Sequence, residues 1–325
     1  MPGRNDALTA SNRDVPESVK NKLMSVSYGS AERIELSCDV HGLYTTEVRF
    51  FVQGASCPKC AKRRSKGEKE IFDFVGQGTS NDRSLGIELD ILIPDKKIAI
   101  EYNGLYWHSD RFVPNDYHFK KWQACHDAGV QLIQIWEDDW KARPDVVKRM
   151  LSAKINGRQS IGARKVQVRD ISFAAASAFL NYWHIQGAAK GSRYVGLFTD
   201  ELVGVAVFRT INGTTYLERY ASSVGISGGL DRTISFVSPA RLVTFADLAV
   251  SNGGLYRGWK TDGFISPDYK YLFKGKRVHK FNFRRSRFES DPELLFDPGL
   301  TEKQLAELNG IPRIYDAGKI RYLYN

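Results

Sequence analysis

Two acidic residues at the ends of neighbouring apolar segments are the most chemically informative feature of this chain. The run ELDILIPDKKIAIEYNGLYWH, residues 88–108, predicts adjacent β-strands at Leu89–Pro94 and Lys97–Tyr102. Asp90 lies in the first strand and Glu101 in the second. A carboxylate inside a buried strand is costly unless a metal ion or a charged partner satisfies it. Two such acids, about a hairpin apart, can share one divalent cation. Because phosphodiester hydrolysis uses such a cation, the run predicts a metal-dependent nuclease.

Either acid alone has a simpler explanation, since an acid near a strand end is more often solvated or salt-bridged. The residues that follow, Asn103-Gly104, Trp107 and His108, favour a functional site. The stretch resembles the PD-(D/E)xK nuclease superfamily, with Glu101-Tyr102-Asn103 standing where that superfamily has Glu-x-Lys. The lysine is therefore missing.

One branch of the superfamily lacks the same lysine. It comprises the very-short-patch repair endonucleases and the phage homing endonucleases called EDxHD. The phrases IEYNGLYWHS, YHFKKWQAC and LIQIWEDDW are similar to those of the phage proteins. The resemblance covers roughly residues 25 to 325, and it implies a phage homing endonuclease that cuts double-stranded DNA at a specific site.

The resemblance also implies a magnesium site. Asp90, Glu101 and the backbone carbonyl of Tyr102 would hold Mg²⁺ against the scissile phosphate, and Glu68 would hold a metal-bound water. Glu68 has a second explanation, because Ser65-Lys66-Gly67-Glu68 is a capping-box pattern at the start of a helix. The pattern by itself favours neither role.

The same resemblance makes His108 the candidate general base, oriented by Asp116. His118, two residues further along the chain, could replace Asp116 under a small shift of alignment. Tyr106 and Trp107 resemble the aromatic wedge that patch-repair enzymes insert between base pairs, although Trp107 could equally pack beneath the site. Lys121, on the helix expected over residues 116–128, is given no catalytic role.

Charge and composition fit a nucleic-acid partner. The 325 residues carry a net charge of +10, with a pI near 9.3 and 42% hydrophobic residues, values typical of a globular protein that binds a polyanion. We expect phosphate contacts from a basic stretch with interleaved phenylalanines: Lys274, Lys276, Arg277, Arg284, Arg285 and Arg287. A merely solvated basic face is the alternative.

The chain carries no apolar segment of membrane-spanning length and no secretory signal near its first residues. We therefore expect a cytoplasmic protein of a phage-infected bacterial cell. We expect neither a membrane partner nor a small-molecule substrate.

The cysteines predict a second metal. Cys38-x2-His41, a 15-residue interval, and Cys57-x2-Cys60 form two knuckles with the spacing of a structural zinc ribbon. The alternative is two unrelated buried cysteine groups beside a chance histidine. Cys125 is expected to be a small core residue.

These observations predict an α/β protein with a PD-(D/E)xK-like nuclease core, an N-terminal zinc ribbon and an acetyltransferase-like α+β C-terminal domain. The expected parts are a flexible arm and short helix (1–30), the ribbon (31–64), the nuclease domain (65–156) and the C-terminal domain (157–325). In the last part we expect a strand (Lys165–Ile171), a helix (Phe173–His184), a hairpin (Tyr194–Arg209), a third antiparallel strand (Thr215–Ala221), a glycine-rich turn and a helix over Ser238–Ser251. This is the order of an acetyltransferase-like fold. The turn Gly225–Gly229 matches the acyl-CoA loop pattern poorly, which argues against acetyl transfer.

Three other functions remain open at this point. The first is a nicking endonuclease of the mismatch or patch-repair type, and the second is a non-catalytic DNA-binding accessory protein. The third is an RNA-modifying acetyltransferase with a decayed nuclease. The set Asp90, Glu101 and His108 favours the nuclease, because it is complete.

Overall fold

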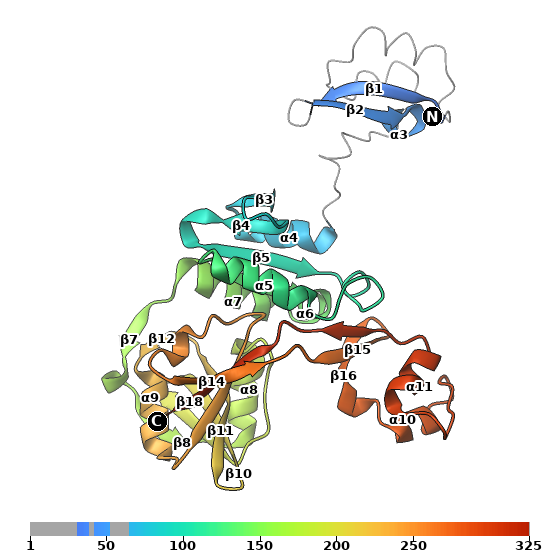
Figure 1. Cartoon of the computed structure of the whole chain (residues 1–325). Helices are drawn as coiled ribbons and strands as arrows, with labels where there is room; N and C mark the ends of the chain where they lie inside the picture. The colour runs from blue at the N-terminus through green and yellow to red at the C-terminus, as the bar shows by residue number, and fades with distance from the viewer. Residues whose placement is uncertain (1–30, 39–41, 53–64, 325) are drawn as a thin grey trace. The chain divides into compact units, whose positions relative to one another are not determined.

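The chain folds into two compact units, residues 1–65 and 66–325. In the computed structural model, the described residues are 31–38, 42–52 and 65–324 (Figure 1). Among them, no helix is long and apolar enough to cross a membrane. The fold is of the mixed α/β class, as predicted.

The N-terminal unit contains an antiparallel hairpin of β1 (Arg33–Cys38) and β2 (Gly42–Glu47), followed by α3 (Val48–Val52). Alternate residues of β1 enter a small core that includes Ile34 and Leu36. Cys38 is the last residue of β1. The other predicted zinc ligands, His41, Cys57 and Cys60, lie outside the described residues, so the zinc site stays a prediction.

The second unit begins with a four-stranded sheet in the order β3-β4-β5-β6. Its strands are β3 (Thr79–Asp82), β4 (Leu89–Ile93), β5 (Ile98–Asn103) and β6 (Gln131–Trp136). β4 and β5 pair antiparallel, whereas β5 and β6 pair parallel. The two predicted acid-bearing strands are therefore neighbours, and the apolar run Gln131–Trp136 forms the strand beside β5.

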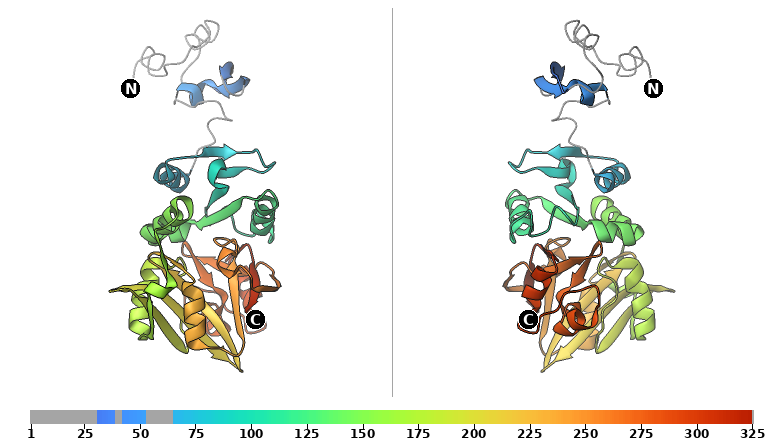
Figure 2. Two further views of the ribbon diagram at one scale, coloured as in Figure 1. Left: turned by 90° about the vertical axis from the view of Figure 1, so that its left-hand side faces the viewer. Right: turned by 90° about the vertical axis from the view of Figure 1, so that its right-hand side faces the viewer.

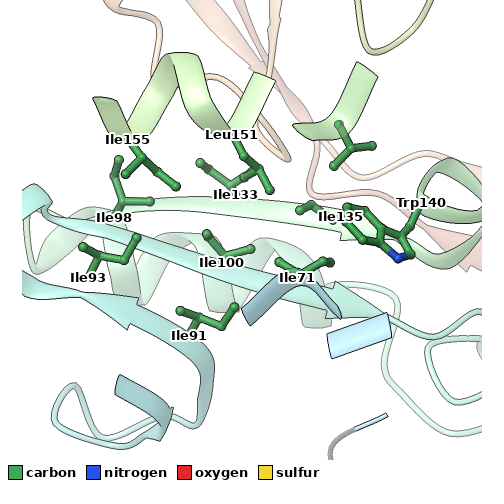
Figure 3. Packing of buried hydrophobic residues seen from close by; sticks show 11 residues of the cluster. Ile71, Ile91, Ile93, Ile98, Ile100, Ile133, Ile135, Trp140, Leu151 and Ile155 are labelled. Carbon is green, nitrogen blue, oxygen red and sulfur yellow. The ribbon is translucent and has the colours of Figure 1, made fainter. Parts of the chain in front are cut away.

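Helices cover both faces of this sheet (Figure 2). They are α4 (Lys66–Val75), α5 (Tyr117–Asp127), α6 (Glu137–Ala142) and α7 (Pro144–Asn156). Isoleucines of β4, β5 and β6 pack with Ile71 of α4 and Leu151 of α7 on one face (Figure 3). On the other face α5 places Trp122 and Cys125 in a second core, so the prediction for Cys125 is confirmed.

Residues 157–324 are built around a seven-stranded sheet in the order β14-β18-β13-β11-β10-β9-β8. The strands are β8 (Gln167–Asp170), β9 (Arg193–Phe198), β10 (Leu202–Ile211), β11 (Thr214–Ser222), β13 (Leu242–Asp247), β14 (Lys260–Ile265) and β18 (Lys319–Tyr324). Two helices accompany them, α8 (Phe173–Trp183) and α9 (Gly229–Val237). The predicted order of strand, helix and three antiparallel strands is present.

Two expectations in this half are wrong. The helix predicted over Ser238–Ser251 is instead strand β13, because Leu242, Val243 and Thr244 fit an extended buried strand better than a helix. The segment Gly225–Gly229, expected to be a turn, is a turn only at Gly228. Its first residues form β12 (Gly225–Ser227), which pairs with β7 (Ser160–Gly162).

A small lobe is inserted between β14 and β18 (Figure 1). It contains β15 (Tyr269–Phe273), β16 (Lys276–His279), α10 (Arg285–Ser290), α11 (Glu302–Leu308) and β17 (Arg313–Tyr315). Its core is largely aromatic and includes Tyr271, Phe283 and Phe288. The lobe therefore has a hydrophobic core of its own.

The two halves of this unit share packing. Leu248 and Ala317 join the core beneath α5, and Ile314 packs with Leu105 and Trp136. A backbone hydrogen bond of 2.7 Å runs from Gln134 N to Ala249 O. The segments 65–156 and 157–325, which were predicted as separate domains, thus share hydrophobic cores.

Candidate functional site

Asp90 and Glu101 meet at the ends of β4 and β5. The last register pair of these strands is Ile91 with Ile100, so the two acids are the next residues on facing strands. The Glu101 Oε1 atom accepts a hydrogen bond from the Asp90 backbone N–H at 3.0 Å. In return, Asp90 Oδ2 accepts one from the Tyr102 N–H at 2.7 Å. Each carboxylate is thereby fixed by the backbone of the opposite strand.

Both carboxyl groups have raised pKa values. Glu101 is only 3% exposed. Its burial, followed by the charge of Asp90, raises its pKa to about 8. Burial also raises the pKa of Asp90. Two acids held together away from water favour either a proton or a cation between them.

Lys121 supplies the charged partner that the sequence analysis missed. Its Nζ lies 2.6 Å from Glu101 Oε2, and both side chains are largely buried. Burial alone would lower the pKa of Lys121, but the Glu101 carboxylate outweighs burial and raises it. A signal was present in the helix pattern, because Lys121 lies three residues after the buried His118 and four before the buried Cys125. A lysine on a buried helix face requires a partner.

His108 follows β5 and lies close to the acid pair. Its Nδ1 atom is buried and has no hydrogen-bond partner among the described residues. Burial, with a smaller effect from the Lys121 charge, lowers the pKa of His108 to about 4. The imidazole is therefore neutral at pH 7 and able to accept a proton.

His118 stacks on His108, with ring centroids 5.1 Å apart. It is 1% exposed, and its Nδ1 lies 2.7 Å from Gln134 Oε1. Burial lowers its pKa to about 3. His118 thus supports the ring of His108 from inside the protein and is not among the residues that line the pocket beside the acids.

The pocket beside the acids has a volume of about 550 Å³. Its charged and titratable lining residues are Glu88, Asp90, Glu101, Tyr102, His108, Asp116, Tyr117, Lys120 and Lys121. Asp116, predicted to orient His108, precedes α5, and its carboxylate pairs with Lys120 at 2.9 Å. The pocket therefore joins five of the predicted site residues, Asp90, Glu101, Tyr102, His108 and Asp116, to Lys121, which was given no role.

Glu68 lies in the first turn of α4, as predicted, and is half-buried. That turn packs tightly against β5, because a Cβ atom at the preceding Gly67 would lie 2.2 Å from Cζ of Tyr102. Glu68 is not among the residues that line the pocket. The structure therefore places it near the site but outside the pocket wall.

An exposed aromatic cluster follows the acid pair along the chain. The side chains of Tyr106, Trp107 and Phe112 are 50%, 66% and 46% exposed. Their ring centroids lie 4.9–5.1 Å apart. Neither Tyr106 nor Trp107 is packed beneath the site, and Phe112 is a third member that the sequence analysis missed. We call these three residues the aromatic cluster.

Most of the basic residues predicted to contact phosphates have partners inside the lobe or next to it. Arg277 is the clearest case, because its Nε donates to Asp138 at 2.9 Å and its NH2 group to Asp139 at 2.6 Å. Its guanidinium also stacks over Trp136 at 4.6 Å. Arg277 thus joins the lobe to α6 through ion pairs with Asp138 and Asp139.

The remaining five differ in their surroundings. Lys274 pairs with Glu293 at 2.5 Å, Arg287 with Asp291 at 3.5 Å, and Arg284 approaches Glu302 at 3.9 Å. Arg285 donates to the carbonyls of Pro298 and Leu300. Lys276 is exposed at the start of β16. Sequence clustering could not distinguish these structural contacts from a free basic surface.

No family model matches the chain, and no curated protein matches it. Among solved structures, it is similar to a GNAT family acetyltransferase from Elizabethkingia anophelis with acetyl-CoA bound. That match has 13% identity and a TM-score of 0.27, over 50% of this chain and 98% of the other. It is also similar to a Bacillus subtilis acetyltransferase in complex with CoA, at 9% identity and a TM-score of 0.26, over 50% of this chain and 99% of the other.

Proposed function

We propose that this protein is a metal-dependent DNA endonuclease whose site is the pocket at Asp90 and Glu101. The observation that carries the proposal is the reciprocal placement of these two buried carboxylates, each held by the opposite strand and open to one pocket. Metal-dependent phosphodiester hydrolysis uses a divalent cation held by oxygen ligands. Two adjacent carboxylates can provide such ligands.

Two carboxylates and a backbone carbonyl fit Mg²⁺, which prefers oxygen ligands and retains several waters. When both are ionised, Asp90 and Glu101 carry two negative charges against the single charge of Lys121, and burial, followed by the charge of Asp90, raises the pKa of Glu101. Among the described residues no group of three or more His, Cys, Asp and Glu side chains could hold a metal. The ion would rest on Asp90, Glu101 and the Tyr102 carbonyl, with waters as its other ligands. It would neutralise the scissile phosphate and lower the pKa of a bound water.

Two side chains could assist the attacking water. The neutral imidazole of His108 can accept a proton. The ammonium of Lys121 keeps its charge and can stabilise negative charge on the phosphate, as the missing lysine of the Glu-x-Lys pattern would do. Lys121 on α5 could thus supply the positive charge that Asn103, which stands at the lysine position of the pattern on β5, cannot supply.

A nicking enzyme of the patch-repair type is the second candidate. The exposed aromatic cluster favours it, because rings that protrude beside the site could insert between base pairs. An accessory protein that only binds DNA is the third candidate, and it does not require the Asp90–Glu101 pair.

Incubation of the full chain with a randomised duplex DNA library, with and without Mg²⁺, tests the proposal when the new ends are sequenced. Asp90→Asn should abolish the Mg²⁺-dependent ends and keep DNA binding. Glu201→Gln, an equal change of charge at an exposed turn, should leave them unchanged. Absence of Mg²⁺-dependent ends with the wild-type protein would leave only the DNA-binding candidate.

A further inference from the structure

A second cavity opens where two parallel strands of the large sheet separate. β11 and β13 are paired only where Thr215–Leu217 lies beside Leu242–Thr244. Beyond that point, residues of both strands line a cavity of about 450 Å³, which is closed on another side by α7. A cavity of this size can hold a small molecule. It shares no lining residue with the pocket at Asp90.

Three cationic side chains, Lys154, Arg158 and Arg219, contribute to its wall. Arg158 donates to the carbonyl of Ser222, and Arg219 donates to the carbonyls of Gly187 at 3.2 Å and Glu218 at 2.6 Å. Within the described part of the chain, none of the three cations forms an ion pair with a carboxylate.

The two acids of the cavity wall, Glu218 and Asp247, have partners other than these three cations. The Glu218 carboxylate pairs with Arg209 at 2.6 Å. The Asp247 carboxylate accepts hydrogen bonds from Gln186 Nε2 at 2.7 Å and from the Ala249 N–H at 3.0 Å. Lys319 adds a further positive charge. The cavity therefore carries more positive than negative charge.

Two titratable groups of the cavity wall, Lys154 and His184, have lowered pKa values. Burial, followed by the charge of Arg158, lowers the pKa of Lys154 to about 8. Burial, followed by the charges of Arg219 and Arg143, lowers the pKa of His184 to about 3. Half-buried cations that lie together without an ion-paired carboxylate repel one another, and an anion that joins them would relieve this repulsion.

We propose that this cavity binds a phosphate-bearing small molecule of nucleotide size, with Lys154 and Arg158 as its phosphate ligands. Phosphate matches a guanidinium and an ammonium better than a single carboxylate does, because it offers several charged oxygens. Trp183 and Tyr256 add aromatic rings to the same wall, against which a base could stack. The site does not depend on the nuclease function, because it lies outside the pocket at Asp90.

The test is thermal melting and calorimetric titration of the full chain with ADP, inorganic phosphate, adenosine and a short single-stranded oligonucleotide. ADP should raise the Tm of the wild-type protein, whereas adenosine should not. Lys154→Met should bind ADP at least about 10-fold more weakly, the loss expected for one charged hydrogen bond. Its Tm without ligand should not fall, because the substitution removes an unpaired buried charge.

Lys190→Met, an equal loss of charge at an exposed position, is the matched control and should bind ADP like the wild type. Arg158→Gln is the second variant and should also weaken binding. The proposal is overturned if neither ADP nor phosphate stabilises the protein, or if Lys154→Met keeps the full shift. It is also overturned if only the oligonucleotide binds in a Lys154-dependent way, because the phosphates would then belong to DNA.

Discussion

Asp110 and Arg313 are 203 positions apart in the chain and are joined by three hydrogen bonds. Arg313 donates its backbone N–H at 2.9 Å and its Nε at 2.7 Å to the Asp110 carboxylate. The Asp110 N–H donates in turn to the Arg313 carbonyl at 2.8 Å. The segment that carries His108 and the aromatic cluster is thereby fixed to the inserted lobe.

The first prediction concerns this link. Arg313→Lys keeps the charge and the two backbone hydrogen bonds but loses the bond from Nε to Asp110, so we expect a stability loss of about 1–3 kcal/mol. DNA cleavage should fall by more than the loss of folded protein explains, because the segment 104–116 would be held less tightly. Hydrogen exchange should show faster exchange in that segment alone. Arg321→Lys, which changes the half-buried pair with Asp262, is the control and should spare cleavage.

The second prediction separates the two groups that could assist the water. Lys121→Met should lower cleavage at least ~10²-fold if its charge stabilises the phosphate, and His108→Ala should do the same if the imidazole accepts a proton. Lys303→Met, an equal loss of charge at an exposed position of α11, should cut DNA like the wild type. Full activity in His108→Ala together with loss in Lys121→Met would show that the helix lysine replaces the histidine.

The third prediction is a pH dependence of stability in the metal-free protein. The pKa of Glu101 is raised to about 8 in the folded chain from an ordinary value of 4.5. The folded state therefore binds the proton more tightly than the unfolded state. The stability from this group is fully present below pH 4.5 and is lost as the pH rises to about 8. Chemical denaturation in EDTA across this range should show the decline, and Glu101→Gln should flatten it.

The fourth prediction concerns zinc. If Cys38, His41, Cys57 and Cys60 form a structural site, the natively purified chain should contain one zinc per molecule. Cys57→Ser should lose that zinc and unfold the N-terminal unit, while residues 66–325 keep their melting transition, since they are a separate compact unit. A zinc content below half an equivalent (~0.5) would reject the ribbon.

The sequence predicted the strands and the meeting of Asp90 with Glu101, because apolar periodicity and a short hairpin determine which residues face each other. It did not predict that Lys121 lies beside Glu101. That contact depends on where α5 crosses the sheet, which is a tertiary relationship. The ion pairs of Arg277 were not predicted for a related reason, because its partners Asp138 and Asp139 come from a segment far away in the chain. A charge pattern shows where a basic side chain occurs in the sequence, but not which group that side chain contacts in the fold.

The helix expected over Ser238–Ser251 was wrong because a short apolar run has no period that separates a buried helix from a buried strand. The β-branched residues Val243 and Thr244 carried the better signal. Exposure is a second property that the sequence leaves open. The sequence Tyr106-Trp107 is compatible with packed or with exposed rings, and only the three-dimensional structure shows that both rings are exposed to solvent.

The last prediction concerns the aromatic cluster. Trp107→Ala and Phe112→Ala should leave the Tm nearly unchanged, because these side chains are 66% and 46% exposed. Both should weaken DNA binding, since each ring contributes about 1–3 kcal/mol when a base stacks on it. The fluorescence of Trp107, read as the difference between wild type and Trp107→Ala, should be quenched when duplex DNA is added. Leu43→Ala, a change at an exposed apolar residue of the N-terminal unit, is the control. Unaltered DNA affinity in both cluster variants would show that the rings do not touch DNA.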